Sequence, residues 1–480
     1  MNNYYKNFVA GEWKDAITKI EVTNPETGEI FANVAEANFS DVEEVIDAAR
    51  KCVDSGILTK DRPKERTRLL LKIAKNIRQI GISEGAELLS KENGKSIADA
   101  QDEFDTAARY FEYYAGMADK IEGKSIPLGD GYIDFTIYEP IGVSLQIVPW
   151  NFPVDICARS LAPALAAGNA VIIKSPEITP LAITLIAKAC QQAGLTNGAL
   201  SILCGLGSTI GNALVSTPDI DQIVFTGSVE TGKHILKTAA ENATPCIMEL
   251  GGKSAAVVFE DADINQFVAS VAWGIYFNAG QICSAMSRII VERSIYQKVI
   301  NAVVNLSKKV QLGTHSEVKF TPLTSELQYQ RVLDKIKLAK SQGAELVYGG
   351  NAVAEKEGYY IEPTVFKNVS PDSDLFLNEV FGPVVAILPF DTEQQTFELA
   401  NATDYGLVSG VFTNDLSRAL RASRSLKSGQ VFVNEWFAGG VETPFGGIKM
   451  SGFGREKGQE ALYSYVNTKN IAIKVNTIHD

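Results

Sequence analysis

From Val143 onward, short apolar runs alternate with amphipathic stretches along the chain. Continuous apolar runs are typical of strands buried on both faces of a parallel sheet, and the stretches between them carry apolar residues at helical spacing. This alternation predicts a doubly wound α/β unit. The expected strands cover residues 143–148, 170–174, 200–204 and 222–226, with expected helices at 181–193 and 211–216.

The flanking segments follow related patterns. Residues 1–40 alternate and turn, which predicts short strands, and a capping box at Ser40-Asp41-Val42-Glu43 predicts the start of a helix. Helical spacing continues at residues 64–80 and 98–117. After residue 283 a second α/β unit is predicted, with strands at 288–292, 345–348, 408–412 and 430–434 and helices at 296–310, 327–342, 394–401 and 417–426.

Residues 122–140 break the helical pattern at Gly123, Pro127, Gly129 and Gly131, and residues 133–138 are expected to form an extended arm. The tail alternates again at residues 470–475, which predicts a strand that pairs with this arm region. An extended arm of this kind favours an oligomer.

Composition narrows the class of protein. A chain of 480 residues should hold more than one domain, and a net charge of −12 argues against nucleic acid as a partner. The sequence contains no run of 18 apolar residues, so no membrane span is expected, and the start of the chain lacks the apolar core of a signal peptide. The six cysteines form no C-x-x-C pair, and three histidines cannot supply a rich metal site. We expect a reduced, cytoplasmic protein without a metal.

The stretch from Glu249 to Cys283 carries the candidate chemistry. A thiol can attack a carbonyl carbon, and a carboxylate can take a proton from the group that completes the reaction. The chain has only His234, His315 and His479 as histidines, and none is near a cysteine in sequence, so a carboxylate is the more natural base. Without a catalytic role, Cys283 would be a buried core cysteine and Glu249 a surface carboxylate.

The run from Met248 to Ser254 (MELGGKS), with Cys283 downstream, resembles the NAD(P)-dependent aldehyde dehydrogenase superfamily of the hydrolytic, non-acylating type. The resemblance runs nearly end to end and includes the pentapeptide Pro149–Pro153 and the closing loop 444–456. It implies a fold with two doubly wound α/β domains and a β oligomerisation arm. The expected divisions are residues 1–121 and 141–248 for dinucleotide binding, 249–447 for catalysis, and 122–140 and 460–480 for the arm.

The resemblance also implies roles for individual residues. Cys283 would be the nucleophile, Asn151 and the Cys283 N–H would stabilise the oxyanion, and Glu249 would activate water. Taken without the resemblance, Asn151 is as easily a turn or helix-cap residue. The implied cofactor residues are Lys174, Glu177, Gly227, Ser228, Trp150, Glu379 and Phe381.

Glu177 favours NAD over NADP, because its carboxylate can accept from ribose hydroxyls and would repel a 2′-phosphate; NADP remains the second choice. The sequence from Gly205 to Gly211 is one residue longer than the usual dinucleotide fingerprint. Its two interpretations, as a phosphate loop and as a plain turn, stay open.

By analogy, a substrate tunnel would be lined by Phe152, Asp155, Arg159, Phe277, Ile282, Ser284, Trp436 and Phe437. Asp155 and Arg159 stand four apart on a predicted helix and could pair with each other. If they do not pair, Arg159 would suit a carboxylated aldehyde and Asp155 an amino aldehyde.

The expected activity is the oxidation of a small aldehyde to its acid through a thiohemiacetal and a thioester on Cys283. A coenzyme A-acylating dehydrogenase is the first alternative, although Glu249 argues against it. A cysteine hydrolase would leave the cofactor residues without a task, and a non-catalytic relative would not need Cys283, Glu249 and Asn151 together. The expected assembly is a homo-oligomer, a dimer or a dimer of dimers (homotetramer).

Overall fold

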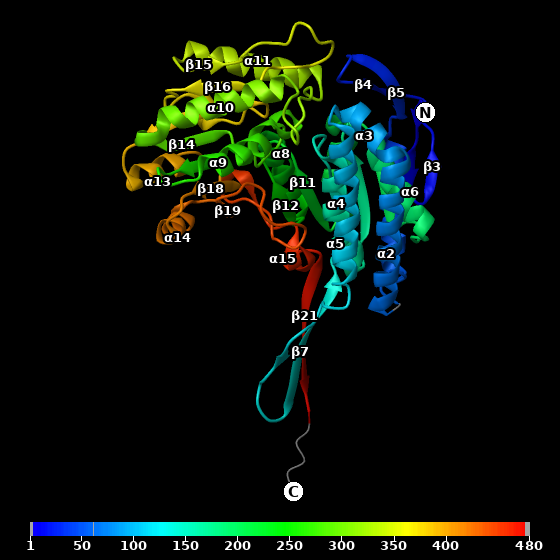
Figure 1. Ribbon diagram of the computed structural model, residues 1–480. Coiled ribbons are helices and arrows are strands. Elements are labelled where there is room, and N and C mark those ends of the chain that lie inside the picture. Colours follow the sequence, from blue (N-terminus) through cyan, green and yellow to red (C-terminus); the bar gives the residue numbers. More distant parts are fainter. Residues whose placement is uncertain (1–2, 61, 476–480) are drawn as a thin grey trace.

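A computed structural model describes residues 3–60 and 62–475 of the chain. His479 and the last residues of the predicted arm lie outside this part. The chain forms two α/β lobes beside each other, and a narrow β-sheet arm projects below them (Figure 1). Within the described ranges, no helix combines the length and apolar composition needed to cross a membrane.

The first lobe contains an eight-stranded sheet in the order β20-β12-β11-β8-β9-β10-β2-β3. Strands β8 to β12 are parallel to one another, and their buried faces on both sides explain the continuous apolar runs in the sequence. The predicted strands of this region are therefore confirmed. The strands are β2 (Asn7–Val9), β3 (Glu12–Lys14), β8 (Val143–Ile147), β9 (Ala170–Ser175), β10 (Leu200–Cys204), β11 (Gln222–Thr226), β12 (Cys246–Glu249) and β20 (Gly452–Phe453).

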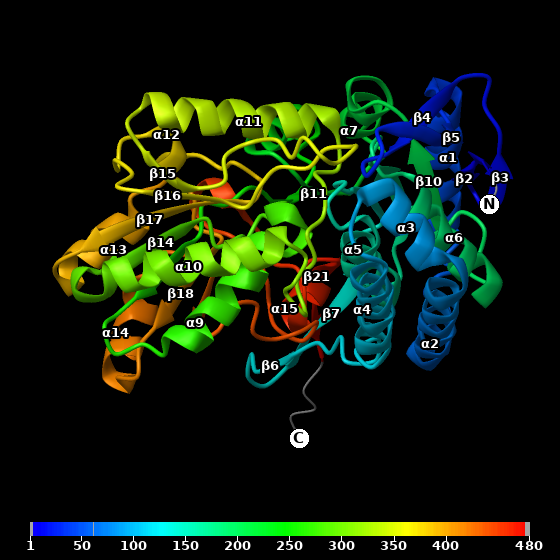
Figure 2. The ribbon, with the colours of Figure 1, turned by 45° about the horizontal axis from the view of Figure 1, so that its top comes forward.

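Helices cover both faces of this sheet. One face packs against α2, α4, α5 and α6, and the other against α1, α7 and α8; α4 and α5 run side by side (Figure 2). The helices are α1 (Phe39–Asp54), α2 (Pro63–Ile80), α3 (Ala86–Asn93), α4 (Ile97–Ala115), α5 (Pro153–Ala167), α6 (Leu181–Ala193), α7 (Asn212–Ser216) and α8 (Val229–Ala239).

The predicted start of the first helix is wrong by a few residues. The side chain of Asn38, not Ser40, caps α1, and Asp41 accepts a hydrogen bond from the Asn38 N–H at 2.9 Å. The Ala37 N–H donates to the Cys204 carbonyl at 2.7 Å, so the chain is tied to β10 up to this point and turns into the helix directly afterwards.

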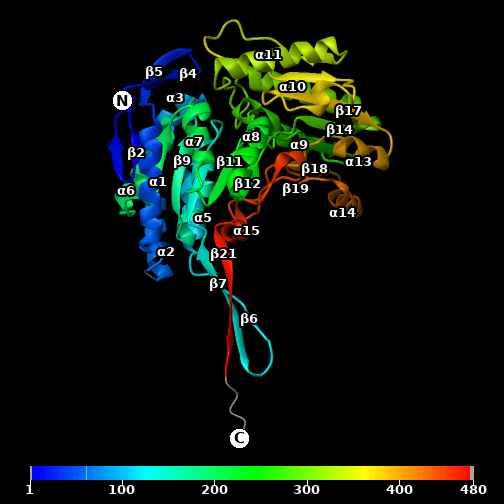
Figure 3. The same ribbon diagram turned by 180° about the vertical axis from the view of Figure 1, so that it is seen from behind.

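The second lobe contains a seven-stranded sheet in the order β15-β16-β17-β14-β13-β18-β19, parallel except for the edge strand β15. Figure 3 shows it facing β11, β12 and α8 of the first lobe. Its strands are β13 (Ala255–Val258), β14 (Arg288–Glu292), β15 (Glu345–Tyr348), β16 (Thr364–Lys367), β17 (Val384–Phe390), β18 (Val408–Phe412) and β19 (Gln430–Val433). Its helices are α9 (Ile264–Val271), α10 (Tyr296–Gln311), α11 (Glu326–Ser341), α12 (Asp374–Leu377), α13 (Glu393–Asn401) and α14 (Leu416–Ser425).

The arm is an antiparallel sheet of β6 (Ser125–Ile126), β7 (Tyr132–Pro140) and β21 (Val466–Lys474), with α15 (Gly458–Tyr463) at its base. The pairing runs from Val466 with Pro140 to Lys474 with Tyr132, which confirms the predicted pairing of the tail with the arm region. A second small sheet, of β1 (Tyr4–Tyr5), β4 (Lys19–Asn24) and β5 (Glu29–Ala35), lies at the N-terminal edge.

Candidate active site

Cys283 sits on a tightly folded turn that follows two short helical segments. Asn278, Ala279 and Gly280 all have positive φ, at 49°, 52° and 72°. Left-handed backbone at a non-glycine residue is strained, and it persists where the surroundings enforce it. A Cβ atom at position 280 would lie 2.3 Å from the Gly382 carbonyl oxygen, so glycine is required there by space as well as by φ.

The fold brings the two ends of the stretch from Glu249 to Cys283 together. A Cβ atom on Gly252 would lie 2.2 Å from the backbone oxygen of Cys283, so only glycine allows this approach. Glu249 is the last residue of β12, and it lines a cavity that Cys283 also lines. The two residues are 34 positions apart in sequence (283 − 249), and only the fold brings them to one cavity.

Asn151 follows the carboxyl end of β8 and is buried. Its side-chain amide donates to the Gln281 carbonyl at 2.8 Å, two residues before Cys283. One N–H of the amide is used in this way, and the second is available to another acceptor. Asn151 therefore connects the end of β8 to the turn that carries the thiol.

Cys283, Asn151 and Ile156 line two cavities at once. The smaller has a volume of about 390 Å³ and contains most of the predicted tunnel residues. The larger, of about 750 Å³, extends along the start of α8 and past Glu249. A thiol at such a junction can be reached by two different molecules from two directions.

The electrostatics of the thiol and the carboxylate are set by burial. Burial raises the pKa of Cys283 to about 12, and the Arg159 guanidinium works against this rise. Burial, and next the charge of Glu456, raise the pKa of Glu249 well above its ordinary value, while Arg159 opposes them. Neither carboxylate oxygen of Glu249 has a hydrogen-bond partner among the described residues. A buried carboxylate without protein partners is suited to exchange a proton with a small molecule.

Arg159 does not pair with Asp155, although their helical spacing had left such a pair possible. Its guanidinium forms an ion pair with Glu456, which also accepts from the Ser160 hydroxyl at 2.6 Å. Arg159 also donates to the Thr226 hydroxyl at 3.3 Å and is only 5% exposed. Its charge is therefore engaged by protein groups beside Glu249 and Cys283, and a substrate carboxylate would compete with Glu456 for it.

Most predicted tunnel residues line the smaller cavity. They are Phe152, Asp155, Arg159, Phe277, Ile282, Ser284 and Phe437. Trp436 is the exception: it is buried behind the wall, packs against Gly274 and Gly410, and donates its indole N–H to the Ser284 carbonyl at 3.1 Å. It supports the cavity from the core.

Sequence reasoning missed one wall of this cavity. Asp99, Asp102, Glu103 and Thr106 contribute it from one face of α4, together with Trp273, Phe432, Phe445 and Lys457 from elsewhere. The spacing of the four α4 residues places them on one side of a helix. That polar stripe was visible in the sequence, but nothing in it indicated which neighbour it faces.

Most predicted cofactor residues line the larger cavity. Trp150, Gly227, Ser228, Glu379 and Phe381 do so, and the rings of Trp150 and Phe381 meet edge to face at 5.3 Å. Ser228 caps α8, accepting from the Thr231 N–H at 3.2 Å, and the first turn of α8 faces the cavity. Glu379 accepts from the Gly252 N–H at 3.0 Å, and burial raises its pKa to about 7.

Lys174 and Glu177 lie beyond the lining of this cavity, at the end of β9. They form an ion pair with Nζ and Oε1 2.6 Å apart. Glu177 also accepts from the Gly207 N–H at 2.7 Å, so the loop from Gly205 to Gly211 holds the carboxylate in place. One carboxylate oxygen is thereby engaged twice, and the side chain remains partly exposed at 34%.

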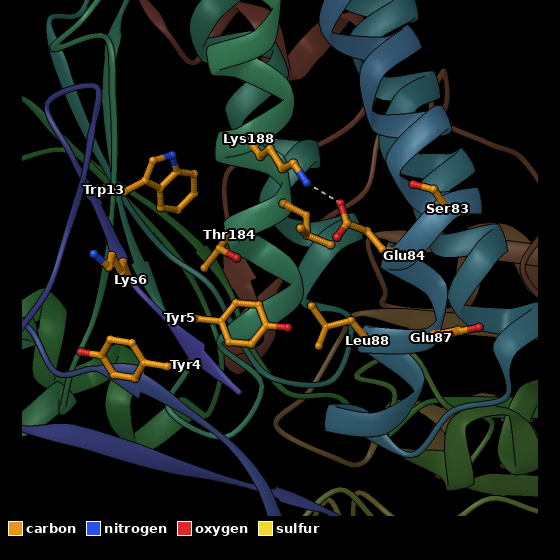
Figure 4. A pocket seen from close by; sticks show the side chains of 11 residues that line it. Tyr4, Tyr5, Lys6, Trp13, Ser83, Glu84, Glu87, Leu88, Thr184 and Lys188 are labelled. Atoms are coloured by element: carbon orange, nitrogen blue, oxygen red, sulfur yellow. Dashed lines mark hydrogen bonds and ion pairs between the residues drawn. The ribbon is translucent and has the colours of Figure 1, made fainter. Parts of the chain in front are cut away.

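A third cavity, of about 670 Å³, lies between the N-terminal strands and helices α3 and α6. Figure 4 shows Tyr5 and Trp13 on one side of it and the ion pair of Lys188 with Glu84, at 2.5 Å, on the other. Cys283, Asn151 and Glu249 do not line it, so it takes no part in the candidate chemistry.

The profile of the aldehyde dehydrogenase family matches residues 13–471 of this chain. Human retinal dehydrogenase 2 is 40% identical over 479 residues, which cover 98% of this chain and 92% of the human one. A peroxisomal aminoaldehyde dehydrogenase 1 of Pisum sativum is 38% identical, covering 97% and 94% of the two chains. The structure of Staphylococcus aureus betaine aldehyde dehydrogenase in complex with NAD⁺ superposes with a TM-score of 0.95 at 34% identity, covering 98% and 95%.

Proposed function

This chain belongs to the aldehyde dehydrogenase family, and from that premise we propose that it oxidises an aldehyde to the carboxylic acid with NAD as the acceptor and water as the second reactant. The observation that carries the proposal is the position of Cys283 at the junction of two cavities, with Asn151 lining both and Glu249 lining the larger. The balanced reaction converts aldehyde, NAD⁺ and water into acid, NADH and a proton.

The larger cavity has the features that NAD requires. The N-terminus of α8, capped by Ser228, lines the cavity and favours a pyrophosphate, and Arg331 adds positive charge to the lining. Glu379 can accept from a ribose diol, and Glu177 would do the same at the adenosine end while repelling a 2′-phosphate. The related S. aureus enzyme holds NAD⁺. When bound, NAD supplies the acceptor for the hydride that leaves the aldehyde carbon.

The residues of the chain would then act in sequence. The Cys283 thiolate attacks the aldehyde carbon, and the Asn151 amide and the Cys283 N–H donate to the oxygen that gains negative charge. Loss of hydride leaves a thioester on Cys283. Glu249 takes a proton from water, the resulting hydroxide attacks the thioester, and the acid leaves as the thiol returns. Burial disfavours the free thiolate, so a cationic ligand in the adjacent cavity would promote its formation.

The charges of the smaller cavity favour an aldehyde with a positively charged far end. Asp99, Asp102 and Asp155 line it, and none of them forms an ion pair with the rest of the described chain. Arg159 is held by Glu456, which leaves Lys457 as the cation facing them. Phe152, Phe277, Phe437 and other rings add apolar and cation-binding surface. A carboxylate-terminated aldehyde would meet three like charges at this wall.

The proposal is tested by mixing the purified protein with NAD, NADP or neither, and with three aldehydes of similar length. These are a trimethylammonium-terminated butanal, pentanal and a carboxylate-terminated butanal, each with and without coenzyme A. We expect NADH and free acid without coenzyme A, fastest with the ammonium aldehyde, and slower turnover with NADP. A requirement for coenzyme A would establish the acylating alternative. Ester hydrolysis without any dinucleotide binding would indicate a cysteine hydrolase.

The double variant Asp99→Asn/Asp102→Asn tests the charge of the α4 wall. Each partly exposed pairing with a cation contributes about 0.2 to 1 kcal/mol, so for the two carboxylates together we expect kcat/KM for the ammonium aldehyde to fall about two- to thirtyfold. The value for pentanal should stay the same, which makes it the internal control. An equal loss for both aldehydes would remove the α4 wall from substrate recognition.

We also propose that residues 122–140 and 460–475 join subunits, as part of a division into dinucleotide-binding, catalytic and oligomerisation regions. The arm of β7 and β21 projects from both lobes and exposes Ile126, Leu128, Tyr132, Ile133 and Ile473 to solvent (Figure 1). Exposed apolar strands of this kind usually pair with another chain. Sedimentation should give a dimer or tetramer, and a monomer at micromolar concentration would contradict the assignment.

A further inference from the structure

The backbone of Asn151, the proposed hydrogen-bond donor to the oxyanion, is held by a network of side chains. Three side chains donate to the Asn151 carbonyl oxygen: Lys95 Nζ at 3.1 Å, Asn278 Nδ2 at 3.2 Å and Asn93 Nδ2 at 3.4 Å. Asn151 then extends its own amide toward Gln281. The position of that amide therefore depends on how firmly its backbone is fixed.

Helix α5, which begins two residues after Asn151, has no cap of its own. Phe152 occupies the N-cap position and makes no side-chain cap bond, and Pro153 follows it. The cap comes instead from α4: one oxygen of Glu103 accepts from the Val154 N–H at 2.9 Å and from the Asp155 N–H at 3.1 Å. Glu103 thus fixes the segment directly after Asn151.

One buried ion pair joins these two restraints. The second carboxylate oxygen of Glu103 binds Lys95 Nζ, and the side chains of Lys95 and Glu103 are 1% and 3% exposed. The Lys95 ammonium also lies 4.2 Å from the centre of the Phe152 ring. Lys95 consequently touches Asn151, Phe152 and the α5 cap at once. Two buried charges are expensive to desolvate, so the pair contributes less to stability than to a defined geometry.

Resting on the function proposed above, we propose that the Lys95–Glu103 ion pair is a positioning device for Asn151. Lys95 fixes the carbonyl side of Asn151 and Glu103 fixes the helix that follows, so the side-chain amide stays where the oxyanion develops. Displacing a reacting group by about 1 Å can cost about 10²-fold in rate. Losing one oxyanion donor costs about 10²- to 10³-fold in kcat.

The test uses Lys95→Met/Glu103→Gln, which removes both charges together and leaves no unpaired buried charge. The amide introduced by Glu103→Gln keeps an oxygen that can accept from Val154 and Asp155, so α5 retains its cap. We expect kcat and kcat/KM to fall together by about tenfold or more, as for an interaction that acts in the transition state. The Kd for NAD should not change, because neither residue lines the larger cavity.

The decisive measurement repeats the substitution in an Asn151→Ala background. If the ion pair acts through Asn151, the double substitution should cause no further fall in kcat/KM in the Asn151→Ala background. The effects of substitutions at residues that work as one unit are not additive. If the two losses multiply, the proposal is overturned. Should the double variant fail to fold, Glu103→Gln alone is compared in the natural and the Asn151→Ala backgrounds in the same way. A wild-type protein without dehydrogenase activity would instead contradict the proposed function itself.

Glu92→Gln is a matched control for a purely structural effect. Glu92 is buried like Glu103 and caps α6 in the same way, accepting from the Leu181 and Ala182 N–H groups at 2.7 and 2.8 Å. Its carboxylate bonds are made to α6 rather than to the segment that carries Asn151. Its substitution should lower the unfolding temperature without any coupling to Asn151→Ala. If the Glu92 and Glu103 substitutions were equally non-additive with Asn151→Ala, the comparison would reflect a general loss of stability and not the position of Asn151.

Discussion

Replacing Cys283 by alanine will abolish aldehyde-dependent formation of NADH, by at least about 10⁴-fold, the size of loss typical for removal of a covalent nucleophile. Cys283 is the cysteine that lines both cavities, so no other thiol of the described chain can attack the same carbon. Binding of NAD should survive, because the proposed cofactor contacts lie along α8 and at Glu379. Stopped-flow absorbance and fluorescence titration of NAD measure the two quantities separately.

Cys246→Ala is the control for this prediction. Cys246 is the other partly accessible cysteine, and burial raises the pKa of its thiol to about 11. It begins β12, at the opposite end of the strand from Glu249. The variant should keep full turnover, and a substrate-protectable thiol label should disappear from Cys283→Ala only. Turnover by Cys283→Ala would rule out the thioester route.

Replacing Glu249 by glutamine will separate the two halves of the reaction. The first turnover should still release NADH as a burst, since attack and hydride loss do not need the base. Hydrolysis of the thioester should then slow about 10²- to 10⁴-fold, the usual contribution of a general base. Acyl-enzyme on Cys283 should accumulate and be detectable by intact mass. Glu442→Gln, at an exposed carboxylate, is the control that should turn over normally.

The pH dependence of thioester hydrolysis tests the assignment of Glu249 as the base independently. Burial and the charge of Glu456 raise the pKa of Glu249, so its proton-accepting form grows as the pH increases. Hydrolysis by the natural enzyme should therefore accelerate from mildly acidic to alkaline pH, and this slope should be lost in Glu249→Gln. A variant without a burst and with full, pH-dependent turnover would assign the base to another group.

The four parallel strands β8 to β11 of the first lobe could be predicted almost to the residue, because burial on both faces produces continuous apolar runs in the sequence. The strand from Gln222 to Thr226 has an apolar centre and is buried at every position. The start of α1 was less determined, since Asn38 and Ser40 are both good caps. The bond from Ala37 to Cys204, which selects Asn38, connects residues far apart in sequence.

The site could be predicted where a local motif carries the chemistry and not where distant segments meet. Glu249, Asn151 and Cys283 stand in recognisable local sequences, and the structure brings them to adjoining cavities. Arg159 shows the limit: its spacing suggested Asp155, but its partner Glu456 comes from the closing loop. The α4 wall and Lys95 carried no motif, because their roles depend on which helix packs against α5.

The junction at Cys283 has a consequence for the order of events in one catalytic cycle. The linings of the two cavities have Asn151, Ile156 and Cys283 in common, and otherwise run over different elements. With the proposed assignment of the two cavities, the dinucleotide and the aldehyde would approach the sulfur by separate routes, and neither would have to pass the other on its way out. In the proposed mechanism, the reduced dinucleotide could then leave while the acyl group is still attached to Cys283, and its departure would give water access to the thioester from the side of Glu249.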